Sequence, residues 1–202
     1  MTRIGILAFG SLIEDPGDEL GARIQDRIEG VETPFSIEFA RSSGTRGGGP
    51  TLIPVEDGGS PVDAVLLALD PAVGLQEATD LLWRRETRKE ASAERYMRPA
   101  NPKRGSVLVE CIRNFHGFDV VLYTRIGANI KELNSDCLAD LAITSARGAA
   151  GARKMDGISY LASVIEHGIV TPLLPAYLDA ILRKTGAQNL DEAHAMIRGD
   201  CV

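Results

Sequence analysis

Strand-like and helix-like segments are segregated along this chain, and their order limits the folds that it can adopt. Apolar or alternating runs predict strands at 3–8, 33–40, 51–55, 62–69, 107–115 and 120–123. From about residue 134 the spacing instead predicts helices at 138–142, 158–166, 173–182 and 191–197, joined by turns that Gly and Pro mark. This segregation favours an α+β fold, in which helices pack around a mixed, β-barrel-like sheet.

Two further helices are expected between the strands, together with two loops that glycine marks. Residues 18–28 follow the Asp15-Pro16-Gly17 break and are weakly periodic, and residues 73–88 have a helical composition and period. A glycine-rich loop occupies 44–50, and His116-Gly117 marks a hairpin turn. No repeat, low-complexity tract or linker interrupts the 202 residues, so we expect a single domain over 1–202.

Acidic residues outnumber basic ones, which bears on the partners of the chain. The 28 Asp and Glu against 22 Lys and Arg give a formal net charge of −6, whereas nucleic-acid binding draws most of its affinity from a basic surface. No apolar run approaches the roughly 20 residues that span a bilayer, and the N-terminal apolar stretch is too short for a secretory signal. We therefore expect a cytoplasmic protein that binds neither nucleic acid nor membrane, and the patterns leave its oligomeric state open.

Several kinds of site lack their sequence signatures. The 44–50 loop has no Gly-Lys-Ser/Thr ending and no G-x-G-x-x-G follows the first strand, so a nucleotide site is not indicated. Ser11 stands outside a G-x-S-x-G elbow, which argues against a serine hydrolase. Neither the cysteines (Cys111, Cys137 and Cys201) nor the histidines (His116, His167 and His194) have metal-ligand spacing. We expect the histidines at surface or capping positions, and a catalytic base among them is the alternative. No metal or cofactor is therefore expected.

Glu86 stands at a position where a carboxylate is unexpected. At about 100° per residue, it falls on the same helix face as the apolar residues Leu75, Ala78 and Leu82. It also lies near the helix C-terminus, where the helix dipole disfavours negative charge. Burial raises the pKa of a carboxyl group, so one in an apolar pocket makes a better base near neutral pH. A structural salt bridge is the alternative, because four cations crowd the same turn: Arg84, Arg85, Arg88 and Lys89.

The segment Phe9-Gly10-Ser11-Leu12, directly after the first strand, is a second candidate. A glycine at the end of a strand lets a ligand approach the backbone closely, and successive N–H groups in such a turn bind a carboxylate or an oxyanion. An ordinary turn that ends the strand explains the same residues.

Taken in order, short motifs along residues 4–185 resemble the γ-glutamylcyclotransferase superfamily, and most closely its glutathione-specific ChaC-like branch. The first is Ala8-Phe9-Gly10-Ser11-Leu12, and the second runs from Arg41 through the Gly-Pro loop to Thr51-Leu52-Ile53-Pro54-Val55. Leu82-Trp83-Arg84-Arg85-Glu86 resembles the Leu-x-x-Arg-Glu at the family's catalytic carboxylate. Segments at 146–151, 160–161, 168–169 and 174–182 resemble its helical tail.

The resemblance implies a γ-glutamylcyclotransferase-like fold and a lyase activity. Such an enzyme closes the γ-glutamyl group of a small peptide or amine to 5-oxoproline and releases the amine. The resemblance further implies that Glu86 is the general base and that no cofactor takes part. The residues implied in substrate binding are Phe9, Gly10, Ser11, Leu12, Arg41, Arg46 and Tyr96.

Three departures from the family pattern concern substrate recognition. Phe9 stands where the family usually has Tyr, and the expected Asn is absent from 152–157. The Gly-Gly-Tyr that commonly follows the catalytic segment is also absent, and Tyr96 is the candidate to replace its tyrosine. Another γ-glutamyl peptide or amine is therefore as compatible with the sequence as glutathione. A non-catalytic module on the same fold, binding a small molecule or a protein, is the alternative function.

Overall fold

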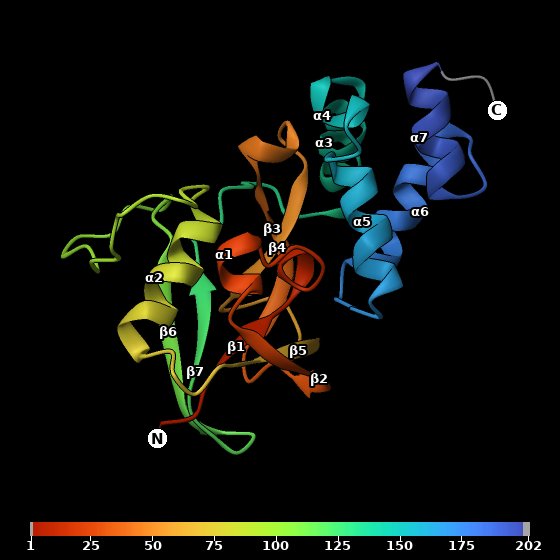
Figure 1. Cartoon of the computed structure of the whole chain (residues 1–202). Helices are drawn as coiled ribbons and strands as arrows, with labels where there is room; N and C mark the ends of the chain where they lie inside the picture. The colour runs from red at the N-terminus through yellow and green to blue at the C-terminus, as the bar shows by residue number, and fades with distance from the viewer. Residues whose placement is uncertain (1, 200–202) are drawn as a thin grey trace. The chain divides into compact units, whose positions relative to one another are not determined.

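The computed structural model of this chain describes residues 2–199 (Figure 1). Its contacts divide the chain into two compact units: unit 1 combines the residues up to Thr33 with Asp63–Gly127, and unit 2 combines Pro34–Val62 with the residues from Ala128 onward. The strands are β1 (Ile4–Ala8), β2 (Ile24–Glu32), β3 (Ser36–Ser42), β4 (Pro50–Val55), β5 (Asp63–Leu69), β6 (Leu108–Phe115) and β7 (Phe118–Arg125). The α-helices are α1 (Asp18–Gly21), α2 (Leu75–Glu86), α3 (Ser135–Arg147), α4 (Ala149–Ala152), α5 (Gly157–Glu166), α6 (Leu174–Thr185) and α7 (Leu190–Arg198). These elements confirm the α+β class, while the barrel-like closure and the single domain stay predictions.

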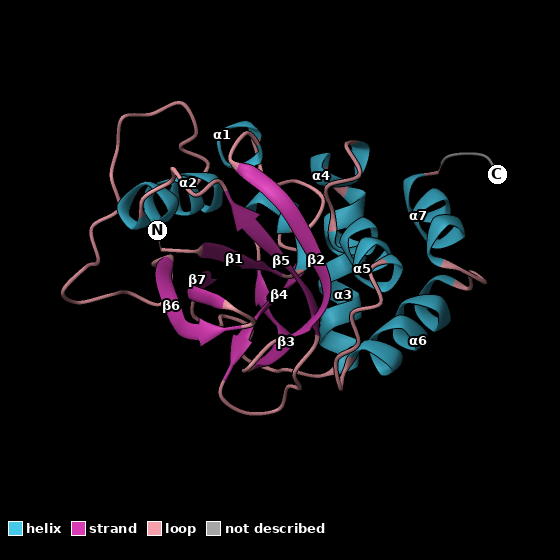
Figure 2. Ribbon diagram, turned by 60° about the horizontal axis from the view of Figure 1, so that its bottom comes forward, coloured by secondary structure: helices cyan, strands magenta, loops and turns pink. Residues whose placement is uncertain are grey.

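A mixed five-stranded sheet forms the body of unit 1, in the order β2-β5-β1-β7-β6 (Figure 2). The central strand β1 pairs antiparallel with β5 and parallel with β7, and all five of its residues are buried. A strand that is covered on both faces reads as a continuous apolar run, as Ile4–Ala8 does. The predicted hairpin is confirmed, because β6 and β7 pair around a two-residue turn in which His116 and Gly117 have φ of 48° and 79°.

The predicted helix over 18–28 is wrong. Only Asp18–Gly21 is helical, and the chain then forms β2, an edge strand that pairs with β5. The more buried positions of β2 are Ile24, Ile28 and Val31, whose spacing of four and three imitates a helical period. Irregularities in the register after Ile24 and after Ile28 hide the alternation of the strand from the sequence.

The predicted helix over 73–88 is confirmed as α2, which packs against β6 and β7 (Figure 1). The buried face of α2, here called its buried line, runs through Ala78 and Arg85. It does not include Leu75, which is 45% exposed. At about 100° per residue, Leu75 and Glu86 lie roughly 60° and 80° from Ala78 on the same side. The expectation that Glu86 shares a core-facing stripe with Leu75 is therefore wrong, since both residues stand at the margin of the buried line.

Unit 2 contains the antiparallel pair β3-β4 and the helices α3 to α7, which begin close to the expected boundary at 134 (Figure 2). Within this unit α3 packs against α6. The strand predicted over 33–40 is confirmed, but its half-burial is wrong, because residues 37–40 are all buried. Helices cover this strand, and the ring of Phe39 packs edge-on against Tyr177 of α6 at 5.3 Å.

The glycine-rich loop over 44–50 is a packing element of unit 2. A Cβ on Gly49 would lie 2.6 Å from the backbone nitrogen of Gly157, at the start of α5. Gly47 has a φ of 59°, and a Cβ there would lie 3.0 Å from the Cβ of Ala150 in α4. The loop therefore brings its backbone close to α4 and α5, which glycine permits at these two positions because it has no side chain.

Candidate functional site

Glu86 is the last residue of α2, and its carboxylate forms an ion pair. Its Oε1 accepts a hydrogen bond from Nη1 of Arg85 at 2.5 Å, and 23% of the side chain is exposed. The salt bridge considered from the sequence therefore exists, and Arg85 is the cation that forms it. Part of the Glu86 side chain remains accessible to solvent.

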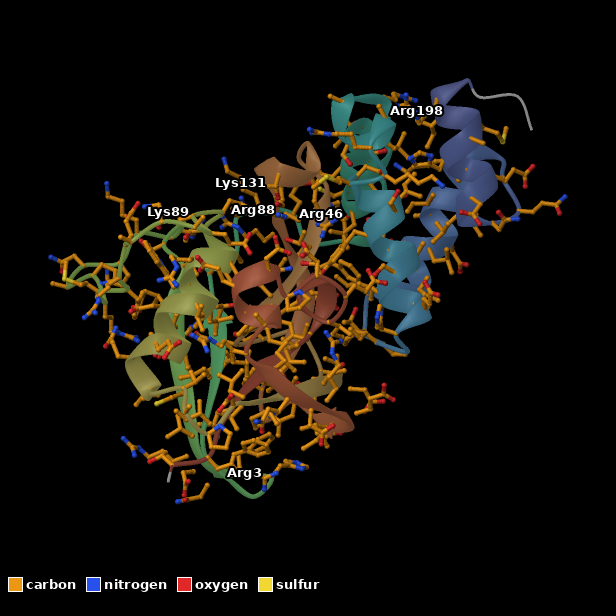
Figure 3. All side chains as sticks on the ribbon, in the orientation of Figure 1. Arg3, Arg46, Arg88, Lys89, Lys131 and Arg198 are labelled. Atoms are coloured by element: carbon orange, nitrogen blue, oxygen red, sulfur yellow. The ribbon has the colours of Figure 1, made fainter. Side chains whose placement is uncertain are left out.

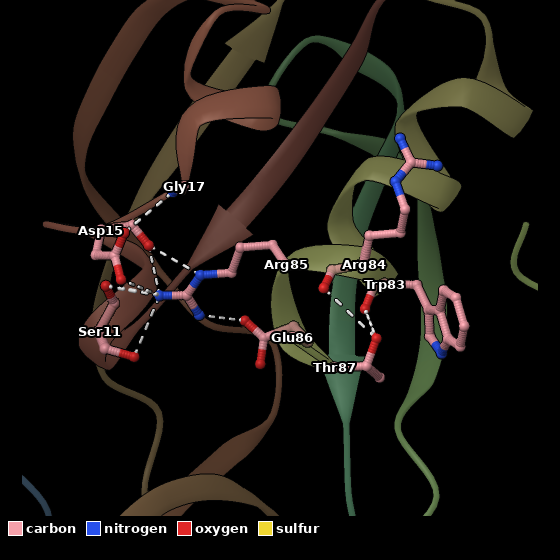
Figure 4. A network of polar contacts seen from close by, with 8 residues as sticks. All are labelled: Ser11, Asp15, Gly17, Trp83, Arg84, Arg85, Glu86 and Thr87. Carbon is pink, nitrogen blue, oxygen red and sulfur yellow. Dashed lines mark hydrogen bonds and ion pairs between the residues drawn. The ribbon is translucent and has the colours of Figure 1, made fainter. Parts of the chain in front are cut away.

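Arg85 is the centre of the contacts around Glu86 (Figure 4). Only 7% of its side chain is exposed. Its Nε donates to the carbonyl oxygen of Asp15 at 2.9 Å, and Nη2 donates to the same oxygen and to the carbonyl oxygen of Ser11 at 3.1 Å. Nη2 also lies 3.4 Å from Ser11 Oγ and 3.8 Å from the Asp15 carboxylate. One buried guanidinium thus joins the end of α2 to the segment that follows β1.

That segment has the sharp turn that its glycine suggests. Phe9 is extended, and Gly10 has a φ of 65° and begins a single 3₁₀ turn that ends at Leu12. The carbonyl oxygen of Gly10 accepts from the N–H of Ile13, while Ser11 is half-buried. The structure therefore brings Phe9, Gly10, Ser11 and Leu12 to the Arg85 side of Glu86, through contacts that Ser11 makes.

Tyr96 lies on another side of α2. Its backbone N–H donates to Asp80 Oδ1 at 2.8 Å, and its ring centre lies 6.2 Å from that of Trp83. The Tyr96 hydroxyl accepts from the N–H of Val109 at 3.2 Å, so it covers part of the outer edge of β6. Within residues 2–199, no polar contact joins Tyr96 to Glu86.

Arg41 and Arg46 belong to unit 2, whereas the other predicted site residues belong to unit 1. Arg41 lies on β3, where burial lowers the pKa of its guanidinium. Arg46 ends the short turn after Ser43, and its guanidinium lies 4.1 Å from the ring centre of Tyr160 in a cation–π contact (labelled in Figure 3).

The sequence did not indicate a second group of contacts, which fixes the chain just after Glu86. Glu19 of α1 accepts from Arg84 Nε and from the N–H of Ala91, both at 2.8 Å, and the hydrogen bond from Arg84 lowers the pKa of Glu19. The backbone turns sharply here, since Arg88 and Ala91 have φ of 56° and 62°. No local signal predicts this contact, because Glu19 and Arg84 are 65 residues apart.

One histidine departs from the expected surface or capping role. His194 is only 13% exposed, and its Nε2 lies 3.1 Å from Oδ2 of Asp156, which has no exposed area. Asp156 caps α5 by accepting from the N–H groups of Ile158 and Ser159, and its other contact links α5 to α7. The expectation for His194 is wrong, because its imidazole is mostly covered and contacts a buried carboxylate between α5 and α7. Cys201 lies outside the described residues.

No protein-family model matches this chain, and no curated protein matches it significantly. Among the described residues, no group of three or more His, Cys, Asp or Glu side chains is placed to hold a metal ion. No helix in that part of the chain is long and apolar enough to cross a membrane.

Proposed function

We propose that this chain is a cytoplasmic γ-glutamylcyclotransferase-like lyase, built on a barrel-like sheet, with Glu86 as its general base. The observation that carries the proposal is the contact that Arg85 makes with both Glu86 and Ser11. The resemblance assigns the base to one of these segments and the substrate loop to the other. Ser11 and Arg85 are 74 residues apart in sequence, and their contact is what a shared site requires.

The reaction is an intramolecular acyl transfer. The α-amine nitrogen of the γ-glutamyl group attacks its own γ-carbonyl carbon, a new N–C bond closes a five-membered lactam, and the bond to the leaving amine breaks. The products are 5-oxoproline and the free amine, so the reaction consumes no water. Because both reacting groups belong to one molecule, the enzyme gains most by folding the substrate into the reactive conformation.

Glu86 suits the proton transfer that this reaction needs. The substrate ammonium first loses one proton to solvent, and the Glu86 carboxylate then takes a proton from the attacking nitrogen and passes it to the departing nitrogen, a role that contributes about 10²–10⁴-fold to the rate. The 23% exposed fraction of Glu86 leaves it accessible to a substrate while Arg85 holds it. Peptide N–H groups in the segment 9–12 would stabilise the negative oxygen of the tetrahedral intermediate.

The test is 5-oxoproline release by the purified full chain. Glutathione, γ-glutamyl-alanine and simple γ-glutamyl amines are offered in turn, and 5-oxoproline is quantified by mass spectrometry. We expect E86Q to lose at least about 100-fold in rate while its circular dichroism spectrum is unchanged. Glu77 is a matched control, since it lies on the same helix and is 43% exposed, and E77Q should keep the rate. Undiminished release by E86Q, or no release from any compound, contradicts the proposal.

A non-catalytic binding module is the second candidate function. The observation that favours it is the ion pair at Glu86, because the contact with Arg85 already occupies one of the two carboxylate oxygens. Isothermal titration with the same γ-glutamyl compounds separates the two functions. Binding without release of 5-oxoproline would favour the module over the enzyme.

A further inference from the structure

The way in which Arg85 binds Glu86 distinguishes the two carboxylate oxygens. Oε1 accepts from Nη1 of Arg85, whereas Oε2 has no hydrogen bond or ion pair within the described residues. We propose that Arg85 is a positioning residue, which holds Oε1 of Glu86 and leaves Oε2 as the oxygen that exchanges the proton with the substrate. This inference rests on the proposed function and deepens it.

Two segments, the stretch after β1 and the end of α2, fix the guanidinium of Arg85 from different directions. Nε and Nη2 both face the carbonyl oxygen of Asp15, Nη2 also faces the carbonyl oxygen of Ser11, and Nη1 faces Glu86 (Figure 4). The guanidinium is planar and rigid, so anchoring Nε and Nη2 also sets the direction of Nη1. The position of Oε1 therefore follows from two backbone carbonyls outside α2.

Arg85 faces a second carboxylate besides that of Glu86. The Asp15 carboxylate lies 3.8 Å from Nη2, on a different nitrogen from the one that binds Glu86. One cation is therefore shared between two carboxylates. Asp15 has 60% of its side chain exposed and interacts mainly through solvent, whereas Arg85 is buried. Oε2 thus belongs to a carboxylate whose orientation Arg85 fixes, which is the geometry that a general base needs.

Lysine in place of Arg85 separates charge from geometry. A lysine keeps the positive charge but presents one nitrogen, which cannot reach Ser11, Asp15 and Glu86 at once from a single position. We expect R85K to lower kcat about 10- to 100-fold, because a misplaced base loses part of its usual contribution. KM should stay within about threefold, since Arg85 is not expected to touch the substrate.

The control variant A78G tests whether any weakening of α2 lowers kcat as R85K is expected to do. Ala78 is fully buried on α2, and A78G lowers the helix propensity without removing a polar contact. We expect A78G to keep the wild-type kcat. If R85K keeps kcat within about twofold of wild type, or if A78G loses as much as R85K, the positioning role is refuted while the proposed function stands.

A measurement without turnover tests the same geometry independently of the reaction. The full chain is treated with a water-soluble carbodiimide and an amine, and the modification of Glu86 is followed by mass spectrometry. If Arg85 fixes Oε1, the Glu86 carboxylate is modified faster in R85K than in the wild-type chain or in A78G. Equal rates in all three proteins overturn the inference. Absence of 5-oxoproline release by the wild type, in contrast, refutes the proposed function, and the carbodiimide rates still decide the positioning of Glu86.

Discussion

Glu38 is a buried carboxylate without a cationic partner among the contacts that its oxygens make. It has no exposed area in β3. Oε1 accepts from the N–H of Phe39 at 2.8 Å and from Thr171 Oγ1 at 2.7 Å, and Oε2 accepts from the N–H of Leu173 at 3.0 Å. Leu173 precedes the first residue of α6, so the carboxylate also lies at the positive end of that helix. We expect Glu38→Gln to destabilise unit 2.

The size of the effect follows from these three contacts. In the better of its two orientations, the amide oxygen of Gln keeps both partners of Oε1, while its NH₂ group faces the N–H of Leu173, donor against donor. The lost bond to a charged group is worth about 1.5–3 kcal/mol, and the two remaining bonds weaken because the acceptor is neutral. Removing a buried charge acts in the opposite direction, since its desolvation cost disappears. We expect the hydrogen bonds to prevail, with a net loss of about 2–4 kcal/mol in the free energy of unfolding.

Urea denaturation followed by circular dichroism measures this loss. Glu132 is the control, because it is an exposed glutamate in the same unit, and E132Q should change the free energy of unfolding by less than about 0.5 kcal/mol. Amide hydrogen exchange at Leu173 should accelerate in Glu38→Gln, since its N–H loses its acceptor. An unchanged or higher stability of Glu38→Gln would refute the reasoning, because desolvation of the charge would then outweigh its hydrogen bonds.

Two further predictions concern unit 2. Burial raises the pKa of Asp156, but hydrogen bonds from Ser159 and Ile158 and the charge of His194 outweigh it and leave the pKa below its ordinary value of 3.8. Asp156 therefore contributes fully to the stability of the fold above pH 3.8, and this contribution is lost as the pH falls further. D156N should remove the corresponding part of the pH dependence of the free energy of unfolding. D179N, at an exposed carboxylate, should retain the wild-type pH dependence. Gly49→Ala should cost about 1–3 kcal/mol, because its Cβ would lie 2.6 Å from the backbone of Gly157. Gly44→Ala, whose Cβ would meet nothing within 4 Å, should have little effect, and equal denaturation midpoints for the two variants would contradict the packing role of Gly49.

Most element types could be predicted from the sequence, since burial along one element leaves a local period. The apolar run of β1, the hairpin turn at His116-Gly117 and the helix α2 all have such patterns. The prediction failed at β2, where bulges after Ile24 and Ile28 produce a helix-like spacing. It also failed for the exposure of Leu75 and Glu86, because the buried line of α2 is set by the sheet on which it packs.

The candidate site illustrates what local sequence leaves undetermined. The sequence by itself placed Glu86 at the end of a helix, among four cations, and placed a glycine turn after the first strand. Only the tertiary structure selected Arg85 as the cation that pairs with Glu86, and only it brought the backbone of Ser11 and Asp15 to the same guanidinium. The physical reason is that the spacing of apolar residues along an element depends on that element alone. The hydrogen-bond partners of Arg85 instead include segments about 70 residues away in the sequence, and the packing of the whole unit fixes how these segments approach.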